Sequence, residues 1–182
     1  MAWDSYLPNN GEQNPRWTRI LSAYLTEGVL QGVHDWGSGQ SILVVLQREV
    51  QTPGTWRLRW LYAFDNRLKL ADSSFATRCS FTLNNALPTE LHFGLHLPVG
   101  VTTAFASRND LGRTVFTGKF QVRYPNNMGY IAISRAGLNS NKTEAIFYVD
   151  HFCGQCGGGR YVLMRKVNGI WKVIGELYTW IS

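Results

Sequence analysis

The strongest constraint on the fold is the dipeptide Asn168-Gly169, which separates two runs of β-forming residues. A two-residue hairpin turn of type I′ needs a positive φ angle at both turn positions, and asparagine and glycine adopt that angle most readily. The flanking runs, 160–167 and 170–180, are rich in branched and aromatic residues, as are 130–134 and 143–152. We therefore predict an antiparallel meander of about four strands in the C-terminal part of the chain.

The N-terminal part of the chain is predicted to supply the main helix. Residues 1–14 are rich in Asn, Gly and Pro and are expected to form an irregular arm. Asn14 can cap a helix that begins at Pro15, and apolar residues then recur at steps of three and four. These apolar residues are Trp17, Ile20, Leu21, Tyr24 and Leu25. We expect one helix over residues 15–31 whose apolar face packs on the sheet.

Length and composition fit a single domain. The chain has 182 residues, of which 45% are hydrophobic and 13% are aromatic. These fractions exclude an intrinsically disordered protein, which has few aromatic residues and a high charge. A chain of this length corresponds to about one domain. The predicted fold class is therefore α+β, with residues 15–182 forming one domain in which a curved antiparallel sheet, made of the meander and earlier strands, packs on the N-terminal helix.

Aromatic residues at four positions indicate a ligand pocket between the helix and the sheet. In the segment 56–62, Trp56 and Trp60 alternate with arginines, as expected of a half-buried strand. Their face either packs in the core or forms an aromatic platform that stacks a base or a sugar. Together with Tyr161 and Trp171 of the meander, these tryptophans are the candidate walls of a pocket for a small apolar or aromatic ligand.

The segment His151-Phe-Cys153-Gly-Gln-Cys156 carries the sharpest chemical signal. The spacing of its cysteines is that of a dithiol oxidoreductase, whose reactive thiol lies at a helix N-terminus. It also resembles part of a zinc site, with His151 as a third candidate ligand. A structural alternative is a glycine-rich bend with positive φ angles leading into the next strand, with the cysteines reduced or joined in a small ring. Because the glycines at 157–159 disfavour a helix, we favour this structural alternative and expect no cofactor, with zinc left open.

Charge and targeting signals point away from nucleic acids and membranes. The net charge is +6, and residues 92–182 hold the whole surplus, with ten basic residues against four acidic ones. The cations are scattered singly and form no continuous stripe that would follow a phosphate backbone, so we do not expect nucleic acid as a partner. The longest apolar run, 42–46, is too short to span a membrane, and the N-terminus lacks a signal-peptide pattern. A cytoplasmic location is the default expectation, and an extracytoplasmic one follows if the mature protein begins at Met1.

Several stretches of the C-terminal region resemble a group of uncharacterised bacterial proteins. The first stretches are Tyr124-Pro-Asn-Asn127, Ser134-Arg-Ala-Gly137 and Thr143-Glu-Ala-Ile-Phe-Tyr-Val149. The later ones are Cys153, Cys156-Gly157, Asn168-Gly169, Trp171-Lys-Val173 and Trp180-Ile-Ser182. The resemblance implies a bacterial origin and a shared β-rich unit, and it implies no activity and no catalytic residue.

The sequence leaves two functional hypotheses. It contains no serine elbow, no glycine-rich phosphate loop and no helix with two facing carboxylates. The first hypothesis is a non-catalytic binding or interaction protein whose partner is a small molecule or another protein. The second is a thiol- or metal-dependent enzyme centred on His151, Cys153 and Cys156.

Overall fold

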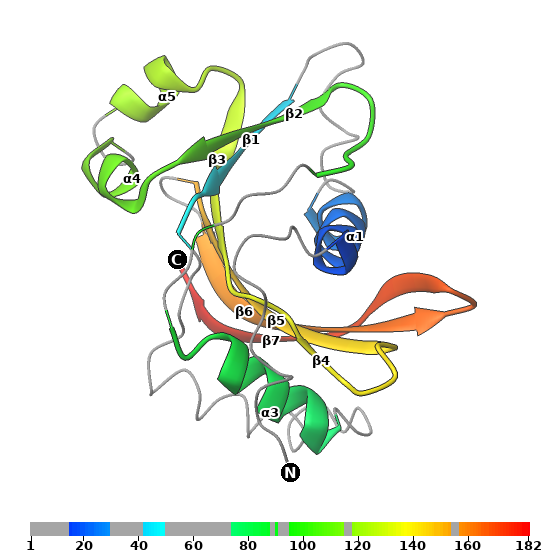
Figure 1. The fold of residues 1–182 in the computed structure, drawn as a ribbon. Coiled ribbons are helices and arrows are strands. Elements are labelled where there is room, and N and C mark those ends of the chain that lie inside the picture. The colour runs from blue at the N-terminus through cyan, green and yellow to red at the C-terminus, as the bar shows by residue number, and fades with distance from the viewer. Residues whose placement is uncertain are drawn as a thin grey trace.

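In a computed structural model of the protein, seven strands among the described residues form one sheet (Figure 1). The structure describes residues 15–29, 42–49, 74–87, 90, 95–114, 118–153 and 157–182. The strands are β1 (Ile42–Gln47), β2 (Val101–Ala106), β3 (Asn127–Ile133), β4 (Gly137–Leu138), β5 (Glu144–Phe152), β6 (Gly157–Val167) and β7 (Ile170–Ile181). They lie in the order β2-β1-β3-β5-β6-β7, and the short β4 pairs with β5. With the helices that flank it, this sheet confirms the α+β class.

The predicted hairpin at Asn168-Gly169 is confirmed. Val167 pairs with Ile170, and the two turn residues have φ angles of 52° and 82°. The strands β3, β5, β6 and β7 pair antiparallel in that order. Each of them covers one of the four segments that the sequence assigned to the meander, with ends that differ only slightly.

The other end of the sheet differs from the expected antiparallel arrangement. The strand β1 pairs in parallel with both β2 and β3, so the sheet as a whole is mixed. Parallel neighbours cannot be joined by a tight turn and need a long crossover connection. The connection from β1 to β2 contains α3 (Phe75–Asn84), and the one from β2 to β3 contains α4 (Arg108–Thr114) and α5 (Lys119–Arg123). The helices α4 and α5 pack at the parallel end of the sheet, whereas α3 packs against β4 and β5.

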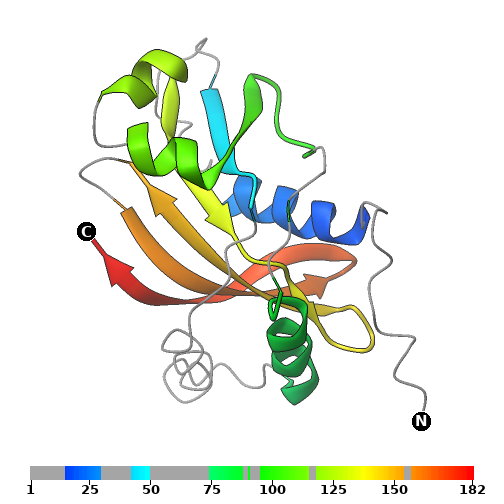
Figure 2. The same ribbon diagram turned by 60° about the vertical axis from the view of Figure 1, so that its left-hand side comes forward.

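One face of the sheet holds the largest core cluster. The helix α1 (Pro15–Tyr24) continues as a π-helical turn over Leu25–Val29. Buried members of this cluster include Ile20, Leu21, Tyr24, Leu25, Val44, Leu46, Ile133, Phe147, Val162 and Met164. The rings of Tyr24 and Phe147 meet edge-on, with centroids 5.1 Å apart. Figures 1 and 2 show α1 on one side of the curved sheet and α3 on the other.

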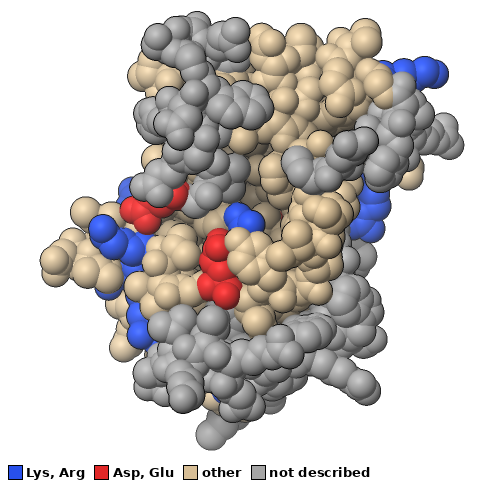
Figure 3. Space-filling model, turned by 180° about the vertical axis from the view of Figure 1, so that it is seen from behind, with Lys and Arg blue, Asp and Glu red and all other residues tan. Residues whose placement is uncertain are grey.

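A polar network joins α1 to the last two strands. The Arg160 guanidinium donates hydrogen bonds to the Tyr24 hydroxyl from Nε, at 3.0 Å, and from Nη2, at 2.6 Å. Its Nε also lies 2.9 Å from a carboxylate oxygen of Glu176. Burial raises the pKa of Tyr24 above its ordinary value, so its hydroxyl stays neutral and accepts both bonds. On the face that Figure 3 shows, the described residues carry only a few charged side chains, and the rest of their surface is uncharged.

Within the described ranges, the helices α3, α4 and α5 lie over parts of the opposite face. The helix α3 begins at Ser74, whose side chain accepts a hydrogen bond from the Thr77 amide. Its Phe81 packs in a cluster with Ile146, Tyr148, Tyr161, Leu163 and Leu177. A third cluster joins α4 and α5 to the parallel end of the sheet through Val45, Ala106, Leu111, Phe120 and Tyr124. Among the described residues, no helix has the length and hydrophobicity needed to cross a membrane.

Candidate functional site

A row of aromatic side chains crosses the sheet on the face that carries α3 and α5. The rings of Tyr130 on β3 and Phe152 on β5 are stacked, with centroids 4.7 Å apart and planes 15° apart. The Phe152 ring also contacts the ring of Trp180 on β7, with centroids 5.2 Å apart and planes tilted by 37°. All three residues are partly exposed. Because stacked rings cover each other's faces, a ligand would reach their edges and the outer face of the last ring in the row.

A fully buried carboxylate lies beside this row. Asp150 is 0% exposed, and its Oδ1 accepts hydrogen bonds from the Tyr148 hydroxyl at 2.7 Å and from the Trp180 indole N–H at 2.8 Å. The Thr179 hydroxyl lies 3.0 Å from the Tyr148 hydroxyl and donates to the carbonyl of Gly159 at 2.9 Å. Hydrogen bonds to an ionised acceptor are stronger than neutral ones and fix the groups that make them. The carboxylate therefore sets the position of the Trp180 ring.

Gly159 makes room for this network. It pairs with both Asp150 and Trp180 across the sheet. A Cβ atom at this position would overlap the Trp180 indole nitrogen, the Tyr148 hydroxyl and the Asp150 carboxylate. A side chain of any size at this position is thus incompatible with the network. The Asp150 carboxylate on the neighbouring strand therefore requires glycine at position 159.

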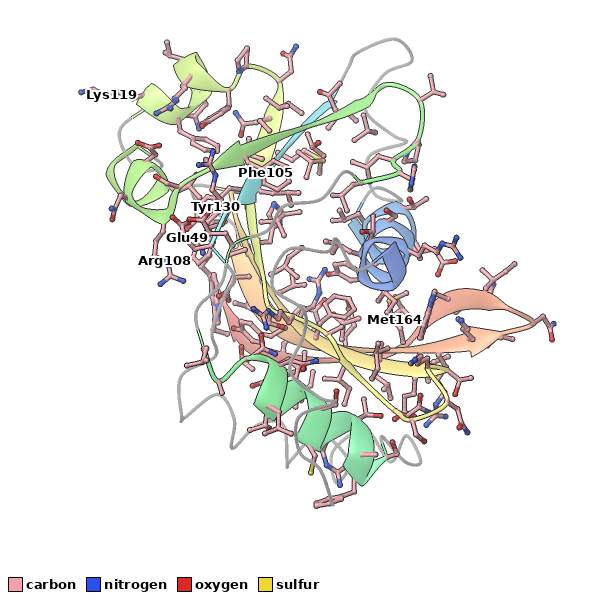
Figure 4. The ribbon with its side chains drawn as sticks, viewed as in Figure 1. Glu49, Phe105, Arg108, Lys119, Tyr130 and Met164 are labelled. Atoms are coloured by element: carbon pink, nitrogen blue, oxygen red, sulfur yellow. The ribbon has the colours of Figure 1, made fainter. Side chains whose placement is uncertain are left out.

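Charged residues flank the row where the parallel strands end. Glu49 follows β1, and Arg108 begins α4 directly after β2. The Arg108 amide donates a hydrogen bond to the Glu49 carboxylate at 2.7 Å. Figure 4 shows both residues near Tyr130, at the same end of β1 and β2. The pKa of Tyr130 is raised from 10.0 to about 12, mainly by burial and also by the charge of Asp150, while Arg108 acts in the opposite direction.

We expect the free energy of unfolding to fall as the pH rises from about 10 to about 12. The folded protein keeps the Tyr130 proton until about pH 12, whereas the unfolded chain releases it near 10.0, so a rising pH favours unfolding. Tyr130→Phe removes this contribution and should make the pH dependence less steep, while the contribution of Tyr24, whose pKa is also raised by burial, remains. Urea unfolding of wild type and variant at pH values on either side of 10 measures the pH dependence of the free energy of unfolding. An unchanged slope in the variant would show that Tyr130 is not the group responsible.

The structure places the residues that the sequence suggested as pocket walls in different surroundings. Trp56 and Trp60 lie outside the described residues. Tyr161 is buried in the cluster with Phe81 of α3, whereas Trp171 belongs to the cluster on the α1 face, with the Lys166 ammonium 5.3 Å from its ring. Tyr161 and Trp171 therefore point to opposite faces of the sheet and do not meet in one cavity.

The site residues that sequence reasoning missed are Tyr130, Asp150, Phe152 and Trp180. Three of them are aromatic residues of the predicted strands and carry no local signal that sets them apart from core residues. Asp150 does carry one, because it is the single acid inside the apolar run from 145 to 152. A charged residue is almost never fully buried unless it is paired, so its place in a buried strand marks a polar network.

The segment around the cysteine pair lies at the end of β5. His151 Nε2 lies 2.8 Å from the carbonyl oxygen of Met128. Cys153 is disulfide-bonded, Cys79 is a free thiol, and Cys156 lies outside the described residues. Within the described ranges, no group of three His, Cys, Asp or Glu residues is arranged to hold a metal ion. The zinc and dithiol roles of His151, Cys153 and Cys156 stay predictions.

The glycines that follow Cys156 enter a strand directly, as predicted, since β6 begins at Gly157 and pairs with β5 from that residue. Their proposed role in supplying positive φ angles is wrong, because none of Gly157, Gly158 and Gly159 has one. What requires glycine at two of these positions is the close approach of other groups. A Cβ at Gly157 would lie 2.6 Å from the carbonyl oxygen of His151, and Gly159 faces the carboxylate network.

In comparisons with known proteins, no family model, no curated protein and no solved structure matches this chain.

Proposed function

We propose that this protein is a non-catalytic binding protein, and that its ligand presents an aromatic or apolar ring to the row formed by Tyr130, Phe152 and Trp180. The observation that carries the proposal is the pairing of a partly exposed aromatic row with a fully buried carboxylate that holds one of its members. Binding sites for small molecules combine aromatic walls with a few fixed polar groups in this way. The row supplies the walls, and Glu49 and Arg108 supply polar groups at its rim.

The complete burial of the Asp150 carboxylate favours a binding function over a catalytic one. A general acid or base has to come within hydrogen-bond distance of its substrate. Asp150 is 0% exposed, and both of the contacts described above are with the protein's own side chains. Its role in the proposal is to position Trp180 and Tyr148, so that the aromatic row is already in place before a ligand arrives. A site organised in advance loses less conformational entropy on binding.

The proposal places the ligand on the other face of the sheet from the pocket that the sequence suggested. On the α1 face, Tyr24, Leu25 and Phe147 are fully or almost fully buried in one cluster. In the proposal, α1 is the layer that closes this face, and the α3 and α5 face carries the ligand. Well-packed cores leave few voids, whereas the aromatic row still has exposed area to offer a ligand.

The test is the binding of 8-anilinonaphthalene-1-sulfonate, an aromatic anion whose own fluorescence reports binding, to folded protein. We expect saturable binding that Trp180→Phe weakens about fivefold, because the smaller ring offers less stacking area and lacks the N–H that Asp150 holds, a loss of about 1 kcal/mol. Trp171→Phe is the matched control, since Trp171 lies on the α1 face. Equal weakening by both substitutions, or binding that never saturates, contradicts the proposal. Near-UV circular dichroism checks that each variant keeps its packing.

The alternative function is a thiol- or metal-dependent enzyme centred on His151, Cys153 and Cys156. It needs thiolates, because the thiolate is both the nucleophile and the metal ligand. Cys153 is disulfide-bonded in this structure, so the alternative requires a reduced state. Stoichiometric zinc in the reduced, dialysed protein would favour this alternative over the binding protein.

A further inference from the structure

The hairpin of β6 and β7 ends in two exposed aliphatic side chains. Val167 and Ile170 pair across the turn, and they are 42% and 60% exposed. The pairing of β5 with β6 stops at Arg165, so both residues lie beyond the end of β5. Figure 1 shows this end of the hairpin extending outward past α1 and β4. We call Val167 and Ile170 the hairpin tip, which is an apolar point that projects from the molecule.

Three exposed lysines surround the base of the hairpin tip. Lys166 and Lys172 lie on the two strands of the hairpin, one and two residues from the tip. Lys142 belongs to the turn before β5. This turn lies against the same part of β6, because the Lys166 amide donates a hydrogen bond to the carbonyl of Thr143 at 2.8 Å. In Figure 3, Lys and Arg side chains lie behind an uncharged end that protrudes at the left.

Acidic groups do not balance the positive charge around the tip. The sequence from 151 to 175 contains no Asp or Glu. Glu144 on β5 binds Arg165, with its Oε2 atom 3.0 Å from both Nε and Nη2. Lys172 lies directly opposite Arg165 on β7, and like charges in such a pair are destabilising. Among the described residues, no acidic group forms an ion pair with any of the three lysines. Local repulsion that a fold retains in this way is typical of a functional surface, here one suited to an anionic partner.

We propose that the hairpin tip inserts into the interface of an anionic lipid bilayer, with Lys142, Lys166 and Lys172 at the level of the lipid phosphates. A β-strand rises about 3.4 Å per residue, so Lys166 and Lys172 are set back from the tip by about 3 and 7 Å. Segments that bind in the membrane interface bury their apolar side chains by about 5–10 Å. The spacing therefore brings the lysine ammonium groups to the phosphates when the tip reaches the acyl chains.

The order of apolar and basic residues favours a lipid surface over a nucleic acid. A nucleic acid attracts lysines through its phosphates but offers an aliphatic tip no apolar layer to enter. A bilayer has acyl chains directly below its charged headgroups, and lysine stems can lie along apolar surface while the ammonium group stays in water. The tip lies at the opposite end of β6 and β7 from Trp180, so this surface is separate from the aromatic row.

The experiment is co-sedimentation of the full chain with phosphatidylcholine vesicles that contain or lack phosphatidylserine. We expect binding only to the vesicles with phosphatidylserine, and salt should weaken it because ions screen the attraction. Lys172→Gln should weaken binding about fivefold, since one of three cations is lost. The matched control is Lys119→Gln on α5, which should leave binding unchanged. Figure 4 shows Lys119 at the end of the molecule away from the hairpin.

Ile170→Thr tests whether the tip inserts or charge alone attracts the protein. Threonine keeps the branched β-carbon that suits a strand but loses most of the apolar side chain. We expect binding about tenfold weaker, since each CH₂ group buried in a membrane strengthens binding about fourfold. Val122→Thr, at an 85% exposed position on α5, is the matched control and should leave binding unchanged. Thermal unfolding checks that the exposed substitutions leave the fold intact.

Other outcomes overturn the proposal. Wild type that does not bind phosphatidylserine vesicles does so, and so does equal weakening by Lys172→Gln and Lys119→Gln. Binding that Lys172→Gln weakens but Ile170→Thr leaves unchanged would show adsorption by charge without insertion of the tip. If the chain binds double-stranded DNA through Lys172 and does not bind the vesicles, the partner of this surface is a nucleic acid instead.

Discussion

Gly159→Ala is expected to lower the free energy of unfolding by about 3 kcal/mol, at the upper end of what overpacking costs. The new Cβ would overlap the Trp180 indole nitrogen, the Tyr148 hydroxyl and the Asp150 carboxylate. All three groups are tied to one another by hydrogen bonds, so none can move without breaking a bond to the buried carboxylate. The midpoint and slope of the urea unfolding transition give the free energy of unfolding of wild type and variant, and thus the difference between them.

The matched control is Gly158→Ala, one residue away in the same strand. There the added Cβ would find only the Trp180 carbonyl oxygen at 3.2 Å and a carbon of Ile181 at 4.0 Å. Both substitutions remove the same backbone freedom from the unfolded chain, so their difference isolates the clash. We expect Gly158→Ala to change the free energy of unfolding by about 1 kcal/mol or less. Equal losses for the two variants would show that the carboxylate network tolerates displacement.

The antiparallel part of the fold could be predicted because its signals are local. Asn168 and Gly169 both have the positive φ angles that their residue types favour, and the hairpin sets the register of β6 and β7. The N-terminal helix starts at Pro15, where the capping pattern predicted a start. Each of these features depends on residues only a few positions apart, and such features can be read from one sequence.

The parallel end of the sheet and the site depend on contacts between distant segments. The strand β2 was missed because Val-Thr-Thr-Ala-Phe-Ala has no clear alternation, and its partner β1 lies far away in the sequence. The aromatic row likewise combines Tyr130, Phe152 and Trp180 from three strands, and only the strand order shows that their rings meet. The sequence indicated that Gly159 belongs to a bend with positive φ angles, whereas the structure shows a steric requirement set by Asp150.

Asp150→Ala is expected to destabilise the protein by about 3 kcal/mol. The substitution leaves the Trp180 indole N–H without its acceptor, and an unsatisfied buried donor costs about 1–3 kcal/mol. The Tyr148 hydroxyl also loses its bond to the carboxylate and keeps only the Thr179 hydroxyl, 3.0 Å away, within reach. Asp150→Asn keeps an acceptor oxygen within reach of both donors, so it should lose less than half as much. Urea unfolding of the three proteins at neutral pH measures these differences.

Asp110→Ala is the matched control, because it removes a carboxylate that is not buried. Asp110 lies 3.6 Å from Arg123 on α5, and both side chains are about half exposed, so this ion pair contributes about 1 kcal/mol or less. The expected order of losses is thus Asp150→Ala, then Asp150→Asn, then Asp110→Ala. If Asp150→Asn loses as much as Asp150→Ala, the negative charge and not the acceptor oxygen carries the stability. In that case Trp180 is held by electrostatic attraction to the carboxylate, and the ligand affinity of the aromatic row should fall equally in both variants.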